Sequence, residues 1–143
     1  GGRLERVAIL GPLRNRTQVK VSQTDARTLG VAPPVRDSGD LEGAARVRLI
    51  GPAGAVEVEG AIIAARHIHT SPEDAAALGL ADGQQVAVRL GAGARAVVLD
   101  GVRVRVQPGA FTEMHIDTDE ANAAGLVAQG EGGLVVGIGA QRA

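Results

Sequence analysis

Residues 65–90 read ARHIHTSPEDAAALGLADGQQVAVRL, and this stretch indicates how the chain folds. His67-Ile68-His69 alternates polar and apolar side chains, which is typical of a strand. Ser71-Pro72-Glu73-Asp74 approximates a capping box, with proline at the first helical position. Gly79 is a natural helix stop, and the apolar pattern resumes over residues 85–90. The stretch therefore predicts a unit of strand, short helix, turn and strand.

Two further segments, residues 22–31 and 118–126, repeat this unit. Each copy follows a predicted strand, opens with Ser22, Ser71 or Thr118 as a helix-capping residue, and closes with glycine and an aliphatic residue. The copies are too few and too unevenly spaced to form a solenoid. We therefore expect a mainly β protein made of two small β-barrels capped by short α-helices.

Strands are expected where alternating or short Val/Ile runs lie between turn signals. They are Glu5–Leu10, Gln18–Ser22, Ala45–Ile50, Ala55–Val58, Ala61–Arg66, Gln85–Leu90, Ala96–Leu99, Val102–Val106, Glu113–Ile116 and Gly133–Ile138. We place the first barrel, with the arginine-bearing loop at residues 11–17, in residues 1–63, and the second, with all three histidines, in residues 64–143. A strand-like stretch follows the first residues directly. We therefore expect the chain to come from the interior of a longer protein, with its first barrel incomplete at the N-terminus.

The composition excludes several classes of function. A net charge of −1 offers no basic field for nucleic acid or an anionic membrane, and Phe111 is the only aromatic residue available for base stacking. Without cysteine there is no disulfide, thiolate metal site or covalent thioester. No apolar run approaches the length of a membrane span, and no secretory signal is present. These features favour a soluble, intracellular protein.

All three histidines lie in two similar segments, RHIHT at residues 66–70 and EMHIDT at residues 113–118. On a strand, His67 and His69 share one face because side chains alternate. His115, from a matching strand, could complete a three-nitrogen site with an open position, the pattern of catalytic zinc. The alternative is a set of surface or hydrogen-bonded histidines that bind nothing.

Two loops carry groups suited to anions. Residues 11–17, GPLRNRT, present Arg14 and Arg16 on a turn, and guanidinium groups grip phosphate bidentately. Residues 35–40, VRDSGD, offer a hydroxyl and backbone donors. Taken singly, each loop has an ordinary alternative, a solvated hairpin tip for the first and a plain turn for the second.

Taken together, these segments resemble the phosphate propanoyltransferase family of the microcompartment type. They are GPLR at 11–14, TQV at 17–19, RDSG at 36–39, ARHIH at 65–69 and EMHIDTDEAN at 113–122. The resemblance runs from about residue 3 to about residue 126. It implies paired β-barrels with two metals, usually zinc, at their junction. It also implies interconversion of acyl-coenzyme A plus phosphate with acyl phosphate plus coenzyme A.

The resemblance makes His67, His69 and His115 the ligands of one zinc ion. In members of the family, an earlier His-x-His segment and a glutamate at the position of Lys20 supply ligands of the second metal. This chain lacks that segment and has lysine at position 20. A basic residue that contacts the nucleotide is usual where this chain has Ala8. We therefore expect one zinc site here instead of two, with activity impaired accordingly.

The same resemblance assigns catalytic roles to Arg14 and Ser38, and places Arg14, Leu10 and Asn122 against coenzyme A. Phosphate needs orientation before it attacks, and the thioester oxygen needs stabilisation as it gains charge. A metal can serve both purposes. Because the chain has no cysteine, direct attack of phosphate is favoured over a covalent acyl-enzyme.

Two alternatives of other classes remain open at this point. The LGLADGQQV segment at residues 78–86 also resembles double-psi and related barrels that only bind ligands or partners. The other alternative is an assembly scaffold derived from the family.

The expected partners are acyl-coenzyme A, coenzyme A and phosphate, with no nucleic acid and no membrane. An open barrel edge favours a homo-oligomer. The resemblance also implies a location in the bacterial cytoplasm or in the lumen of a microcompartment. There, shell proteins or other lumen proteins would be its partners, and it would take part in propanediol degradation.

Overall fold

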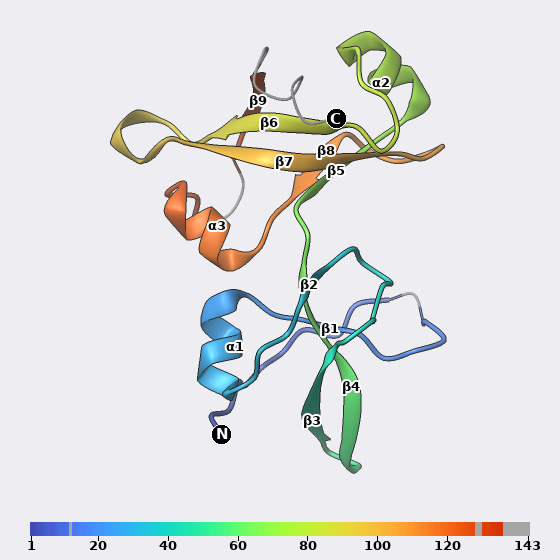
Figure 1. The fold of residues 1–143 in the computed structure, drawn as a ribbon, viewed down its shortest axis with the longest axis vertical. Helices are drawn as coiled ribbons and strands as arrows, with labels where there is room; N and C mark the ends of the chain where they lie inside the picture. The colour runs from blue at the N-terminus through green and yellow to red at the C-terminus, as the bar shows by residue number, and fades with distance from the viewer. Residues whose placement is uncertain (12, 128–129, 136–143) are drawn as a thin grey trace. The chain divides into compact units, whose positions relative to one another are not determined.

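The computed structural model describes residues 1–11, 13–127 and 130–135 of the chain. It divides into two compact units, Gly1–Ala64 and Ala65–Ala143. Strands predominate in both units, and the helices are short (Figure 1). The prediction of a mainly β chain with three short helices is confirmed. No helix in the described part is long and apolar enough to cross a membrane.

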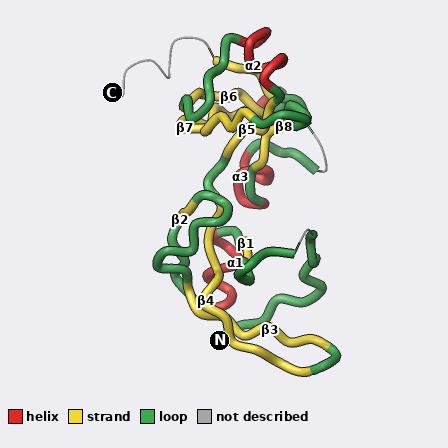
Figure 2. Tube along the Cα trace, turned by 90° about the vertical axis from the view of Figure 1, so that its right-hand side faces the viewer, coloured by secondary structure: helices red, strands yellow, loops and turns green. Residues whose placement is uncertain are grey.

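The first unit is organised around one long strand, β4 (Gly54–Ala64). The strand β3 (Ala45–Gly51) pairs with it antiparallel, and the two project as a hairpin ribbon (Figures 1 and 2). Two short strands, β1 (Val19–Lys20) and β2 (Val35–Arg36), lie on either side of its carboxyl end and run parallel to it. The C-terminal part of β4 is therefore the centre of this sheet.

The core of the first unit gathers where α1 (Gln23–Leu29) meets this end of β4. Ala26 of the helix and Ala61 and Ile62 of the strand are completely buried. The helix begins at a full capping box between Ser22 and Asp25 and ends at Gly30 in the left-handed conformation (φ 72°). Local sequence signals thus set both ends of α1, as expected.

The second unit contains one open sheet of order β8-β5-β7-β6-β9 that curls into a half-barrel. Its strands are β5 (His67–Thr70), β6 (Gln85–Leu90), β7 (Val97–Val106), β8 (Glu113–His115) and β9 (Gly132–Val135). The pair β5–β7 is parallel, and the other neighbours are antiparallel. The β5 strand, which carries His67 and His69, is therefore held on both sides.

Aliphatic side chains from these strands form the core of the second unit. The buried members are Ile68, Val86, Val88, Leu90, Val102, Val104 and Ala124. Each fully buried aliphatic side chain contributes roughly 1.5–3 kcal/mol through the hydrophobic effect. Ile68 points into this core from β5, so the two histidines that flank it face the other way.

The three short helices that the repeat predicts are all present. The second unit contains two of them, α2 (Pro72–Leu78) and α3 (Thr118–Ala123), and also a 3-10 turn at Gly93–Arg95. Ser71 caps α2 by accepting the Asp74 N–H (3.0 Å). The prediction that Thr118 caps α3 was wrong, because Asp117 is the capping residue of that helix. Its carboxylate makes the stronger cap, and it forms a full capping box with Glu120.

Several strand predictions need correction. Glu5–Leu10 is not a strand, and its apolar side chains Val7, Ile9 and Leu10 are largely exposed. An alternating pattern forms a strand only where a neighbouring edge offers hydrogen bonds. The short strand Val35–Arg36 was missed. Residues 136–138 of the last predicted strand lie outside the described residues, as does Pro12 of the GPLR segment.

In two places a pair of predicted strands forms one continuous strand. Residues 55–58 and 61–64 belong to β4, and residues 97–99 and 102–106 belong to β7, while residues 65, 66 and 96 of the predicted strands lie outside them. Gly60 does not break β4. A Cβ atom at Gly60 would run into the Thr17 carbonyl, so this glycine allows the segment that follows Arg14 to approach the sheet.

Candidate functional site

The second unit brings all three histidines together. His67 on β5 lies opposite His115 on β8 in the antiparallel pair, and His69 follows on the same face of β5. The ring centroids of the three imidazoles are 4.8 to 5.1 Å apart. Sheet register therefore clusters side chains from segments that are far apart in the sequence.

The surroundings keep two of these rings neutral near pH 7. Burial lowers the pKa of His67 to about 4, and burial also lowers the pKa of His69. His67 Nδ1 lies 2.8 Å from the Ala65 carbonyl, which can only accept a hydrogen bond, so Nδ1 carries the proton. The Nε2 lone pair of His67 is then available, as in metal sites where a carbonyl fixes the tautomer of a ligating histidine.

His115 differs from the other two because its side chain is exposed. Its Nε2 lies 3.0 Å from Glu113 Oε1. Within the described residues, no three His, Cys, Asp or Glu side chains are arranged to hold a metal ion as they stand. Ligation through His115 Nε2 requires this ring to leave Glu113. The donor set fits zinc in residue type, and the His115 ring at least has to turn before three imidazoles can ligate one ion.

An ion pair ties together the two segments that carry His67 and His115. Arg66 Nε lies 3.1 Å from Glu120 Oε1, with side-chain exposures of 35% and 19%. The other carboxylate oxygen of Glu120 accepts the Asp117 N–H (3.0 Å). Burial raises the pKa of Glu120 despite these partners. The pair therefore links the residue before β5 to the N-terminus of α3, just after β8.

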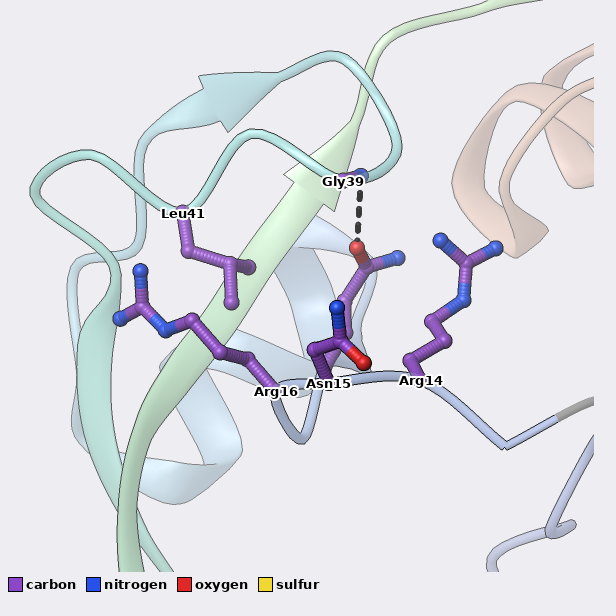
Figure 3. A pocket seen from close by; sticks show the side chains of 6 residues that line it. Arg14, Asn15, Arg16, Gly39 and Leu41 are labelled. Atoms are coloured by element: carbon purple, nitrogen blue, oxygen red, sulfur yellow. Dashed lines mark hydrogen bonds between the residues drawn. The ribbon is translucent and has the colours of Figure 1, made fainter.

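The first unit contains a cavity of about 220 Å³ on the loop expected to bind phosphate. It is lined by Arg14, Asn15, Arg16, Gln18, Gly39 and Leu41. Arg14 and Arg16 extend to opposite sides of Asn15, and Arg16 runs toward Leu41 (Figure 3). A Cβ atom placed on Gly39 would lie 4.0 Å from Arg14 Nη1. Arg14, and not Arg16, thus adjoins the Ser38-Gly39 loop.

Gln18 joins this loop to the arginine segment, and sequence reasoning gave it no role. Its Oε1 accepts the Gly39 N–H (2.7 Å, dashed in Figure 3), and its Nε2 donates to Ser38 Oγ (3.3 Å). The expected backbone donor at Gly39 is therefore already engaged. The only sequence signal was the position of Gln18 inside the TQV segment, beside the Arg14 loop.

The remaining expected residues are more dispersed. Leu10 is 85% exposed and does not line the cavity. Lys20 lies on β1 opposite Ile62, with an exposed side chain. Asn122 is an exposed residue of α3 in the second unit, and its backbone carbonyl accepts a hydrogen bond from Arg95 (2.8 Å). The structure thus gathers the histidines in one unit and Arg14 with Ser38 in the other.

Comparison with known proteins places this arrangement in a family. The family model described as phosphate propanoyltransferase matches residues 1–127. A phosphate propanoyltransferase of Escherichia fergusonii is 54% identical over 125 residues, which cover 87% of this chain and 60% of the relative. Relatives of the same name from Salmonella typhimurium and Thermotoga maritima are 50% and 52% identical, each over 87% of this chain and 60% of its own length.

The chain therefore belongs to the phosphate propanoyltransferase family. It spans about 60% of the length of these curated relatives. The two non-catalytic alternatives, a barrel module and an assembly scaffold, are not favoured, because the match covers most of the chain and includes the segments that carry the histidines and the arginine loop.

Proposed function

We propose that this chain serves as a phosphate acyltransferase, which interconverts an acyl-coenzyme A plus phosphate with an acyl phosphate plus coenzyme A. The single observation that carries this proposal is the position of Arg14 beside the Ser38-Gly39 loop. Arg14 lines the cavity, and Ser38 precedes Gly39, which also lines it. An arginine fork and a neighbouring hydroxyl form a set of donors suited to a tetrahedral oxyanion. Family membership gives that anion its identity as phosphate.

In the proposed reaction a phosphate oxygen attacks the thioester carbonyl carbon. A carbon–oxygen bond forms, the carbon–sulfur bond breaks, and coenzyme A leaves as its thiolate. Arg14 holds two phosphate oxygens, and Ser38 donates its hydroxyl hydrogen to a third. Fixing the nucleophile in this way lowers the entropic part of the barrier. The propanoyl and acetyl groups are the acyl groups that the family resemblance favours.

We further propose that His67, His69 and His115 hold one zinc ion. The support is the cluster of three imidazoles, together with the neutral His67 whose Nε2 is available. When bound, zinc would supply Lewis-acid charge for oxygens that become negative. The family resemblance implies a glutamate ligand of a second metal at the position of Lys20. The ammonium of Lys20 can replace part of the positive charge of a second metal, but it cannot coordinate oxygen as a metal does.

The expected partners and location are also proposals. Strand β8 lies at the edge of the second sheet in the described part of the chain, and an open edge supports pairing with a second copy. The family resemblance supports a bacterial microcompartment and propanediol degradation. Light scattering of the purified protein, and its co-sedimentation with isolated microcompartment shells, test these two points separately.

The function is tested with propanoyl-coenzyme A, phosphate and the zinc-loaded chain, by following the release of free thiol. We expect release that depends on phosphate and that, at low phosphate, is strongly reduced by Arg14→Ala. Arg16→Ala is the matched control, since it removes the same group from the same loop. Thiol release that is independent of phosphate, or equally sensitive to both substitutions, would argue against the proposal.

A further inference from the structure

Gln18 makes two hydrogen bonds that determine its orientation without ambiguity. The Gly39 N–H can only donate, so the amide atom 2.7 Å away must be the oxygen. The Gln18 NH₂ group therefore faces Ser38 Oγ at 3.3 Å. One side chain, half-buried beside the cavity, thus connects the arginine loop to both residues of the opposing loop.

This orientation decides what the Ser38 hydroxyl can do. The Gln18 NH₂ group only donates, so Ser38 Oγ is the acceptor in this bond. The Ser38 hydroxyl therefore does not donate its hydrogen to Gln18. That hydrogen remains for another acceptor. Arg14 Nη1 lies 4.0 Å from the Cβ position of the next residue, Gly39, so an anion held by the guanidinium would bring an acceptor close to this loop.

We propose that Gln18 is a positioning residue, which directs the Ser38 hydroxyl hydrogen toward an oxyanion bound at Arg14. The proposal rests on the proposed function, in which that anion is phosphate. Gln18 does not touch the anion itself. It sets the direction of the hydroxyl through its NH₂ group, and it fixes the backbone of the loop through its carbonyl oxygen.

Substitution by glutamate separates these two tasks. In Gln18→Glu the introduced carboxylate still accepts the Gly39 N–H, so the loop remains fixed. It can no longer donate to Ser38, and instead it accepts the Ser38 hydroxyl hydrogen and turns it away from the cavity. A purely structural Gln18 would tolerate this change, whereas a positioning Gln18 would not. Gln18→Met, of similar length, removes both bonds.

Added negative charge alone also weakens anion binding, and Asn15 provides the matched control. Asn15 lines the same cavity, and within the described part of the chain its side chain makes no hydrogen bond. Asn15→Asp therefore introduces the same charge in the same cavity without changing Ser38. The contrast between Gln18→Glu and Asn15→Asp isolates the hydrogen bond from the charge.

The test is calorimetric titration of the whole chain with inorganic phosphate at pH 7.5. We expect Gln18→Glu to weaken phosphate binding about tenfold more than Asn15→Asp, the usual effect of a hydrogen bond to a charged group. In Ser38→Ala, Gln18→Glu should weaken binding no more than Asn15→Asp does, because the hydroxyl through which Gln18 acts is gone while the Gly39 bond remains. Exchange of the Gly39 amide hydrogen should stay slow in Gln18→Glu.

Each outcome decides a different point. Equal effects of Gln18→Glu and Asn15→Asp in the parent chain, or an excess effect of Gln18→Glu that persists in Ser38→Ala, overturn the positioning role while phosphate binding at Arg14 stands. If Arg14→Ala binds phosphate as tightly as the parent chain, the proposed function fails, and the positioning role fails with it. Fast exchange of Gly39 in Gln18→Glu together with weak binding would show that the residue only holds the loop.

Discussion

His67 on β5 and His115 on β8 are register partners whose imidazole rings stack, with centroids 5.0 Å apart and planes 5° from parallel. Two imidazolium cations at this distance would repel each other, which contributes to the low pKa of His67 after the larger effect of burial. The stacked pair is therefore stable with His67 neutral, the form in which imidazole coordinates a metal.

Zinc content tests the histidine cluster. The purified chain should hold close to one equivalent of zinc by elemental analysis, and the triple substitution of His67, His69 and His115 by alanine should hold none. Chelation of the parent chain should shift the imidazole proton resonances of all three residues, a readout that does not depend on activity. Retention of zinc by the triple variant, or its absence from the parent chain at neutral pH, would exclude this site.

Arg14 and Arg16 should differ in their effect on phosphate. Arg14→Ala should raise the KM for phosphate at least about tenfold, because charge-assisted hydrogen bonds are lost, whereas Arg16→Ala should change it little. Arg14→Lys should restore only part of the loss, since lysine lacks the bidentate fork. Similar KM values for the two alanine variants would indicate general electrostatic attraction by the loop.

The stability of the metal-free chain should depend on pH through His67. Its pKa is about 4 in the folded state and about 6.5 when unfolded, so below pH 6.5 the unfolded state binds more protons. The contribution of His67 is therefore complete above pH 6.5 and is lost as the pH falls toward 4. Urea unfolding in the presence of a chelator, at pH values from 7.5 to 4.5, measures this loss.

His67→Gln supplies the control for that pH series. Glutamine does not titrate, so the difference in unfolding free energy between the parent chain and His67→Gln should change over the same pH interval. A difference that stays constant from pH 7.5 to 4.5 would mean that other groups cause the acid sensitivity.

The ion pair between Arg66 and Glu120 should matter more than its exposed counterpart. Glu120→Ala removes the partner of Arg66 and the acceptor of the Asp117 N–H. We expect a loss of about 1–2 kcal/mol in unfolding free energy, together with weaker zinc binding.

The exposed pair Arg46–Glu59 on the β3–β4 hairpin gives the control, with side-chain exposures of 64% and 61%. Arg46→Ala should change stability little, because solvent screens such pairs. Urea denaturation and a competitive zinc indicator measure the two effects. If Glu120→Ala behaves like Arg46→Ala in both assays, the link between the β5 and β8 segments has no energetic role.

Gly91 should be sensitive to the smallest possible side chain. It has φ 72°, and a Cβ atom there would collide with the backbone carbonyl of Ala124. Gly91→Ala should cost more than the roughly 1–3 kcal/mol of backbone strain alone. Gly43→Ala is matched in φ (69°) but meets nothing within 4 Å. Equal melting temperatures for the two variants would mean that Ala124 moves aside at no cost.

The sequence by itself determined the features that depend on near neighbours in the chain. The ends of α1 and α2 follow from Ser22, Ser71 and the glycines at 30 and 79, because capping bonds reach only a few residues. Alternation along β5 likewise places His67 and His69 on one face while Ile68 enters the core. The family segments were recognisable for the same reason, since each is a short local motif.

Only the tertiary structure decided which distant groups meet. Glu5–Leu10 has the strand pattern but is not a strand, while Val35–Arg36 forms one beside β4, since pairing depends on an available edge. Arg14 lies beside Gly39 whereas Arg16 runs toward Leu41, a difference between two arginines of one loop that depends on how the loops fold together. Gln18 reaches Ser38 and Gly39 across about twenty residues of sequence, a contact that folding creates and no local pattern encodes.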